Sequence, residues 1–256
     1  MVQSLAPAVS YKESNVETNR KVWNSYAKDW KPDQDWVVKM AANLGEEWTT
    51  QGLEHVGDEW SDRASLQQVL DEWVLPHLEG GECVAAEVGV GGGRVAVRVA
   101  PHCSMLHCLD ISSEMLKRAK AAVSHTAPSA RCEYHMQEGN ELPPALEGSL
   151  DFCYSFDCLP HCDAHTIFAY LKEFKRCLKP RAVALVHTSN LCAPGGFARF
   201  ANQKQASVQG FCWVSPEMVR SMVSGAGLEL VRESAVDPSN VYYHRDYLCL
   251  VRRPAD

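Results

Sequence analysis

The stretch ECVAAEVGVGGGRVAVRVAPHCSMLHCLD, residues 82–110, decides the fold of this chain. It opens with a short apolar run, Cys83 to Val88, which predicts a buried parallel strand. Glycines follow at positions 89, 91, 92 and 93, and a helical run ends at Pro101. A second apolar run begins at Met105 and ends in Asp110. Strand, glycine turn, helix, strand and acid form the pattern of a nucleotide-binding half-fold, because the helix start offers free N–H groups and the acid can accept ribose hydroxyls.

Two details separate this stretch from a dinucleotide-binding turn. In the G-x-G-x-x-G frame that starts at Gly89, Arg94 occupies the place of the third small residue, which disfavours helix–strand packing of the dinucleotide type. Glu87 lies inside the first strand, where a buried carboxylate requires a hydrogen-bond donor or a cation. A ligand ammonium group would supply one.

Residues 87–93, EVGVGGG, resemble the E/D-x-G-x-G-x-G signature of the Rossmann-like (class I) S-adenosylmethionine-dependent methyltransferases. The resemblance runs to about residue 252, through ISSEMLKRAK (111–120), MQEGNELP (136–143), LDFCYSFDCLPHC (150–162) and YLKEFKRCLKP (170–180). It departs at Arg181-Ala182, where the family usually has glycines. It implies an α/β fold with a doubly wound, mostly parallel seven-stranded sheet of order 3-2-1-4-5-7-6, strand 7 antiparallel, and an N-terminal helical extension.

The resemblance also implies S-adenosyl-L-methionine as the cofactor. The cofactor-binding residues expected from it are Glu87, Gly89, Gly91, Gly93, Asp110, Ile111, Met115, Glu138, Gly139, Asn140, Ser155 and Phe156. In this set Asp110 would hold the ribose, and Glu138 or Asn140 would pair with the adenine amine. No metal is predicted, because methyl transfer needs no Lewis acid. One compact cluster leaves zinc open as an alternative: Cys158, His161, Cys162 and His165.

Methyl transfer is an in-line displacement, so a base is required only where the acceptor atom carries a proton. The candidate bases, at the carboxyl ends of predicted strands four and five, are Asp157, His161 and His187. Asp157 can also be a turn cap, and His187 a buried core histidine. Aromatic walls suited to the acceptor are expected from Trp23, Tyr26, Trp213, Tyr242, Tyr243 and His244.

Residues 1–78 are predicted to form the helical extension and residues 79–256 the methyltransferase domain. Helices are expected at 11–30, 35–44 and 65–78, a long loop at 188–214, and a polar-aromatic hairpin region at 241–246. The stripe of Trp23, Tyr26 and Trp30 has helical spacing. It either packs in a core or belongs to a lid that closes over the cofactor and acceptor and excludes water.

Composition narrows the function classes. The 256 residues carry a net charge of −7 without a basic block, which argues against a nucleic-acid partner. No run approaches the roughly 18 apolar residues of a membrane span, and no signal-peptide pattern opens the chain. Eleven cysteines without regular spacing predict reduced thiols and a cytoplasmic location. The expected partner is a small-molecule methyl acceptor, and the expected assembly is a monomer or homodimer.

The predicted function is therefore S-adenosylmethionine-dependent transfer of a methyl group to an O, N or S atom of a small metabolite. Two alternatives stay open. A nicotinamide-dependent reductase is disfavoured by Arg94 and by the lack of a Tyr-x-x-x-Lys motif after strand four. A non-catalytic Rossmann-like binding subunit is disfavoured by the intact Glu87, Gly89, Gly91 and Asp110.

Overall fold

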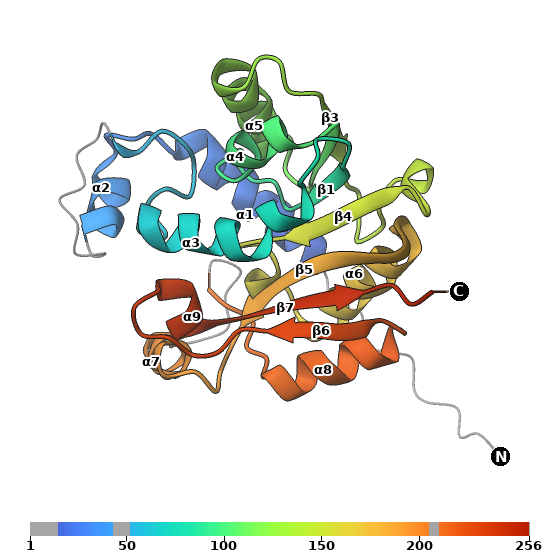
Figure 1. Ribbon diagram of the computed structural model, residues 1–256. Coiled ribbons are helices and arrows are strands. Elements are labelled where there is room, and N and C mark those ends of the chain that lie inside the picture. Colours follow the sequence, from blue (N-terminus) through green and yellow to red (C-terminus); the bar gives the residue numbers. More distant parts are fainter. Residues whose placement is uncertain (1–14, 43–51, 205–209, 256) are drawn as a thin grey trace, which may run out of the picture.

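The computed structural model describes residues 15–42, 52–204 and 210–255. These residues contain a seven-stranded sheet of order β3-β2-β1-β4-β5-β7-β6, surrounded by helices (Figure 1). The first five strands in the sequence run parallel, and β7 pairs antiparallel with both β5 and β6. The fold class, strand order and orientation expected from the sequence are confirmed.

The strands are β1 (Val84–Val88), β2 (Met105–Asp110), β3 (Cys132–Met136), β4 (Leu150–Ser155), β5 (Leu178–Ser189), β6 (Glu229–Glu233) and β7 (Asp246–Arg252). The α-helices are α1 (Asn15–Asp29), α2 (Asp35–Ala42), α3 (Arg63–Trp73), α4 (Ala96–Val99), α5 (Ser113–Thr126), α6 (Ala164–Cys177), α7 (Pro194–Asn202), α8 (Pro216–Gly225) and α9 (Val241–Arg245). Short 3₁₀ turns lie at η2 (Leu75–His77), η3 (Ala100–His102), η4 (Pro144–Leu146) and η5 (Leu159–His161).

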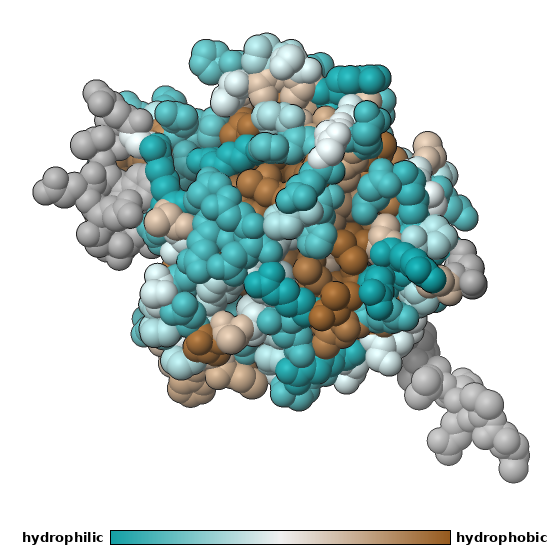
Figure 2. Space-filling view, viewed as in Figure 1, coloured by the Kyte–Doolittle hydropathy of each residue, from teal (hydrophilic) through white to brown (hydrophobic). Residues whose placement is uncertain are grey.

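Both faces of the sheet are buried, which explains the continuous apolar runs of its central strands. On one face, α3, α4 and α5 pack against residues such as Phe152 and Tyr154. On the other face, α6 and α8 pack against residues such as Cys153 and Val186. Figure 2 shows that the face of the molecule seen in Figure 1 is mostly hydrophilic. Apolar residues gather on it over the middle of the sheet, where β4, β5 and β7 lie in Figure 1.

The N-terminal helices form a third apolar cluster, in which Ala27 of α1, Trp30 directly after it and Val37 of α2 pack with Met115 of α5. Helix α1 lies within the range predicted for it, and α2 ends at Ala42, beyond which the prediction lies outside the described residues. Helix α3 belongs to the same core as β1 and β4, although it precedes residue 79. The boundary between extension and domain stays a prediction.

Three predictions about local structure were wrong. The loop predicted at 188–214 contains α7, which starts with Pro194 in its first turn, a favoured place for proline. The hairpin predicted at 241–246 is α9, because the Asn240 side chain caps it by accepting from the backbone N–H groups of Tyr242 and Tyr243. The apolar run at residues 183–187 predicts a fifth strand there, but β5 starts at Leu178. Arg181 adopts φ +67° and its N–H donates to the Arg253 carbonyl at 2.9 Å, so the chain turns without glycine inside the strand.

None of the helices in the described part of the chain combines the length and apolar character that a membrane span requires.

Candidate functional site

The turn after β1 brings its backbone against the end of β2. The N–H of Gly91 donates to Oδ2 of Asp110 at 2.9 Å. Gly91 has φ +53°, and a Cβ placed there would meet nothing within 4 Å, so its outer side is open. Gly93 has φ +90°, and a Cβ there would lie 2.9 Å from Cα of Ala119, which shows how closely α5 packs on the turn. The glycines thus provide both an open backbone surface and close helix packing.

Asp110 is the acid that ends β2, and it is 6% exposed. Its Oδ1 accepts from the N–H of Ser112 at 2.8 Å, and the Ser112 side chain in turn caps α5. Burial raises the pKa of Asp110 to about 6, although its backbone donors oppose this rise. Each carboxylate oxygen has a second lone pair, so Asp110 can still accept hydrogen bonds from ligand hydroxyl groups.

Glu87 lies within β1 and is 1% exposed. Its Oε2 accepts from the hydroxyl of Tyr154 on β4 at 2.8 Å. Burial raises the pKa of Glu87 well above its usual range, and the Tyr154 hydrogen bond opposes part of this rise. A cation placed beside this carboxyl group would favour its charged form.

These residues line a pocket, which we call the inner pocket, of about 870 Å³ including the part open to solvent. Its walls come from α1, the glycine turn, and the carboxyl ends of β2, β3 and β4. They comprise Val16, Asn19, Trp23, Val56, Trp60, Glu87, Gly89, Val90, Gly91, Gly92, Arg94, Val95, Asp110, Ile111, Met115, Gln137, Asn140, Phe156, Asp157, Cys158, His161, Cys162, Thr166 and Tyr170. Ligands of open α/β sheets bind at this end of the strands.

Eight residues expected to bind the cofactor line the inner pocket: Glu87, Gly89, Gly91, Asp110, Ile111, Met115, Asn140 and Phe156. Four do not: Gly93, Glu138, Gly139 and Ser155. Gly93 packs on α5 instead, and the Ser155 hydroxyl donates to the Val88 carbonyl at 3.0 Å. Glu138 pairs with Arg20, 3.3 Å between Oε2 and the guanidinium, on the surface.

Helix α1 is fastened to the turns that carry these residues. The guanidinium of Arg20 donates to the carbonyl oxygens of Ile111 at 3.2 Å, Gln137 at 3.1 Å and Glu138 at 2.8 Å. The Asn24 side-chain oxygen accepts from the Ser112 hydroxyl at 2.8 Å. The extension therefore forms one wall of the inner pocket.

Arg94, which departs from the dinucleotide pattern, is the centre of a buried ionic network. It is 6% exposed, and its Nε lies 3.3 Å from Oδ1 of Asp58. Its Nη1 lies 3.4 Å from Oδ2 of Asp157 and donates to the Tyr242 hydroxyl at 3.1 Å, and its Nη2 donates to the Ser61 hydroxyl at 2.5 Å. One side chain thus connects the extension, the glycine turn, the end of β4 and α9.

Asp157 and His187 continue this network at the ends of β4 and β5. Asp157 has φ +55° and accepts from the Tyr242 hydroxyl at 2.8 Å. Its N–H donates to Nδ1 of His187 at 3.0 Å, and Nε2 of His187 lies 3.1 Å from Oδ2 of Asp246. With Nδ1 accepting, the ring proton belongs on Nε2 and points to Asp246. His187 is fully buried and lines no wall of the inner pocket.

His161 lies at the mouth of the inner pocket. Its Nδ1 is 3.0 Å from the carbonyl of Gly210, which assigns the proton to Nδ1 and leaves Nε2 as an acceptor. The Trp23 ring packs edge-on against the imidazole, with 4.9 Å between centroids. Burial lowers the pKa of His161 to about 4, so the ring is neutral near pH 7.

A second pocket, the outer pocket, adjoins the first and shares Trp23, Trp60, Asp157 and His161 with it. Its other walls are Lys21, Val22, Ser25, Tyr26, Asp29, Trp36, Met40, Glu59, Arg199, Phe211 and Arg245. Of the residues expected to face the acceptor, only Trp23 and Tyr26 line it; Trp213, Tyr242, Tyr243 and His244 do not.

These four side chains have other contacts. Tyr242 and Tyr243 are buried in the core, and the Tyr243 hydroxyl donates to Glu72 at 2.9 Å. Trp213 packs against Phe211, 5.5 Å between centroids. The His244 ring lies over Gly195, where a Cβ would come within 2.6 Å of it.

The cluster weighed as a zinc site from the sequence does not gather its ligand atoms. Within the described ranges, the group of His, Cys, Asp and Glu side chains close enough to hold a metal is His107, Glu133 and His135. The Cys162 thiol instead lies 3.8 Å from the Cys158 carbonyl, and all eleven cysteines are free thiols.

The sequence alone missed several residues of the site, above all Arg20, Asn19, Gln137, Trp60 and Arg199. Asn19 and Arg20 precede Trp23 by four and three residues, so helical periodicity places them on one face with it. That signal was present. Nothing in the sequence marked Trp60 or Arg199, because folding brings them to the site from distant segments.

Comparison with known proteins agrees with this architecture. Residues 85–181 match the family described as "Methyltransferase domain". No curated protein sequence matches the chain. Among solved structures, magnesium protoporphyrin IX methyltransferase from Synechocystis PCC 6803, crystallised with bound S-adenosylhomocysteine, is 14% identical with a TM-score of 0.66, over 94% of this chain and 100% of that one.

Two further structures show how broadly the fold is used. A geranyl diphosphate methyltransferase in complex with geranyl diphosphate and sinefungin is 12% identical with a TM-score of 0.60, over 94% of this chain and 100% of that one. The [4+2]-cyclase SpnF is 16% identical with a TM-score of 0.62, over 93% of this chain and 97% of that one. At these identities the structures establish the fold. The match at residues 85–181 to a methyltransferase domain agrees with the resemblance to class I S-adenosylmethionine-dependent methyltransferases drawn from the sequence.

Proposed function

We propose that the protein transfers the methyl group of S-adenosylmethionine to an O, N or S atom of a small molecule held in the outer pocket. The observation that carries this proposal is the junction of the two pockets. The inner pocket has the acid and the glycine turn of a nucleotide site, the outer pocket has aromatic walls, and both share Asp157 and His161.

The residues of the inner pocket fit the proposed cofactor. Asp110 would accept the ribose hydroxyls, and the buried Glu87 would accept the ammonium group. The side-chain oxygen of Asn140 is buried and has no hydrogen-bond partner among the described residues, so an adenine amine would satisfy it. The open backbone at Gly91 leaves room for the ligand to approach closely.

The cofactor supplies an electrophilic methyl group on a sulfonium, and the protein supplies alignment and a dry environment. Trp23 and Trp60 line both pockets and would help to exclude water from the junction. His161 lines both pockets, and its unprotonated Nε2 would accept the acceptor's proton. His187 is assigned a positioning role, because both its nitrogens are engaged with Asp157 and Asp246.

The walls of the outer pocket favour an acceptor with a flat or apolar body and one anionic group. Tyr26, Trp36 and Phe211 provide apolar ring surfaces. Arg199 stacks on Phe211, 4.0 Å from its ring centroid, and has no carboxylate within ion-pair distance among the described residues. A guanidinium in such a setting is suited to binding a carboxylate or phosphate.

Calorimetry with S-adenosylhomocysteine tests the cofactor site. The wild type should bind one equivalent, and Asp110→Ala should bind roughly 10- to 150-fold more weakly, since a hydrogen bond to a charged group contributes about 1.5–3 kcal/mol. Asp71→Ala, an exposed aspartate on α3, should bind like the wild type. Unchanged affinity in Asp110→Ala would remove the assignment.

The reaction class needs a separate test, because the fold is shared with a [4+2]-cyclase. A set of apolar acids, phenols and amines would be incubated with the protein and S-adenosylmethionine carrying a labelled methyl group. Transfer of label to any of them supports the proposal. Tight cofactor binding with consumption of a substrate but no transfer of label would favour cyclase-like use of the fold.

A further inference from the structure

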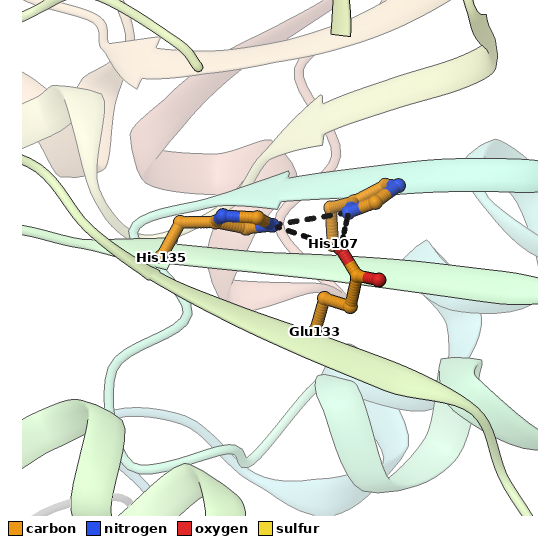
Figure 3. Close-up of side chains that lie close together, drawn as sticks. All are labelled: His107, Glu133 and His135. Carbon is orange, nitrogen blue, oxygen red and sulfur yellow. Dashed lines mark hydrogen bonds and ion pairs between the residues drawn. The ribbon is translucent and has the colours of Figure 1, made fainter. Parts of the chain in front are cut away.

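A third cluster of chemically active side chains lies away from both pockets, on strands β2 and β3 (Figure 3). Nδ1 of His107 is 3.1 Å from Nε2 of His135. Oε2 of Glu133 lies 3.5 Å from the first of these nitrogens and 3.8 Å from the second. Three potential ligand atoms therefore form a nearly equilateral triangle.

The strand pairing produces this arrangement. His107 on β2 is the register partner of Glu133 on β3, and His135 follows two residues later on the same face. The alternate residues Cys108 and Tyr134 pack with the core on the α5 side, so the triangle occupies the opposite face. Two backbone strands, rather than a flexible loop, thus fix the positions of all three side chains (Figure 3).

We propose that His107, Glu133 and His135 bind a late first-row divalent metal ion, with Zn²⁺ as the reference ion. Ligand atoms at about 2.0–2.2 Å from a tetrahedral metal are about 3.3–3.5 Å from one another. The observed separations of 3.1, 3.5 and 3.8 Å depart from this by only a few tenths of an ångström. Two imidazoles and one carboxylate suit zinc, nickel, cobalt or copper and disfavour magnesium or calcium.

A hydrogen bond between the imidazoles of His107 and His135 explains only the separation of their two nitrogens. It leaves the Glu133 carboxylate close to two ring nitrogens that have one proton between them. A metal ion satisfies all three atoms at once. The side chains are 11% exposed at His107, 23% at His135 and 56% at Glu133, so an ion can enter from solvent and keep a water ligand.

The site would act on the fold rather than on the reaction. Strand β3 is an edge strand, and β2 and β3 end at Asp110 and Met136 beside the inner pocket. The N–H of Gln137 donates to the Asp110 carbonyl at 2.9 Å, which continues this pairing. A bound ion would fasten β3 to β2 and raise the thermal stability of the protein. The sequence-based prediction of no metal would then hold for the chemistry alone.

Metal-free full-length protein should be titrated with Co²⁺, because the eleven free thiols make total zinc uptake ambiguous. We expect one equivalent with visible bands of a nitrogen–oxygen site and no thiolate charge-transfer bands, displaced by Zn²⁺. Zn²⁺, but not Mg²⁺, should raise the Tm. Both effects should be lost in His135→Gln and in Glu133→Gln, the second of which changes a side chain exposed enough to leave folding intact.

His125→Gln, an exposed histidine on α5, is the matched control and should behave like the wild type. Melting curves in chelator verify that each variant is folded before metal is added. Uptake by the two site variants equal to that of the wild type, a spectrum dominated by thiolate bands, or binding only at millimolar concentrations would overturn the proposal.

Discussion

Replacing Arg94 with methionine tests the buried network that connects the extension to the site. The substitution keeps an unbranched, flexible side chain but leaves Asp58 and Asp157 without their shared cation. The two carboxylate side chains are 6% and 16% exposed. Removing one partner of a buried ion pair costs about 3–5 kcal/mol, mostly because the remaining charge is stranded.

The hydrogen bonds that both carboxylates keep in the variant narrow this range of destabilisation. Asp58 keeps two backbone donors, from Glu54 at 2.9 Å and His55 at 2.8 Å, and Asp157 keeps the Tyr242 hydroxyl. Because these hydrogen bonds remain in the variant, we expect Arg94→Met to lower the free energy of unfolding by about 3–4 kcal/mol, toward the lower end of the range.

Urea unfolding of the wild type and the variant at pH 7 measures this difference in the free energy of unfolding. Asp58→Asn should be destabilising alone but should recover stability in the Arg94→Met background. Arg98→Met, one turn along the chain and partly exposed, is the matched control and should cost about 1 kcal/mol or less. A deficit below 1 kcal/mol for Arg94→Met, or no recovery of stability from Asp58→Asn in the Arg94→Met background, would refute the ionic account.

Three other outcomes follow from the site. His161→Gln should lower turnover about 10²- to 10⁴-fold for acceptors that lose a proton, with little change in S-adenosylhomocysteine affinity, as single-turnover rates and calorimetry would show. Because burial lowers the pKa of His161 to about 4, the folded state resists a proton that the unfolded state accepts below about pH 6.5. Wild-type stability should therefore fall relative to His161→Gln by about 3 kcal/mol as the pH falls from 6.5 to 4, and parallel unfolding curves for the two would contradict this. Arg20→Ala should release α1 from the turns at Ile111 and Gln137, weakening cofactor binding and exposing α1 to limited proteolysis, whereas Lys21→Ala on the same helix should do neither.

The central sheet was predictable because local signals agree there. Apolar runs of five or six residues, the glycine turn, and the helix caps Ser112 and Asp163 all point to the same elements, and every strand except β5 begins and ends within a residue or two of its run. Where prediction failed, a single side chain decided the local structure. Asn240 turned an aromatic segment into a helix, and Arg181 made a turn without glycine.

The residues of the site also differ in whether local sequence signals could place them. Residues within the strand–turn–strand unit, such as Glu87, Gly91 and Asp110, could be placed from their spacing, because the backbone between them is short and regular. The residues of the outer pocket could not be placed from the sequence. Its walls meet from α1, α2, the segment around Trp60, α7 and the segment around Phe211, and their contacts depend on tertiary packing that no local pattern encodes.

Arg94 shows how a departure from a motif can carry structural information. In the glycine frame it is an outlier, and the sequence supported only a negative conclusion, against dinucleotide packing. In the fold, Arg94 lies in the turn just before the short helix α4, and its guanidinium contacts Asp58 and Ser61 of the extension and Asp157 at the pocket junction. A glycine there would leave these carboxylates without their shared cation. The segment around Asp58 and the glycine turn are therefore coupled through one ion network, so the placement of that segment and the orientation of Asp157 depend on the same residue.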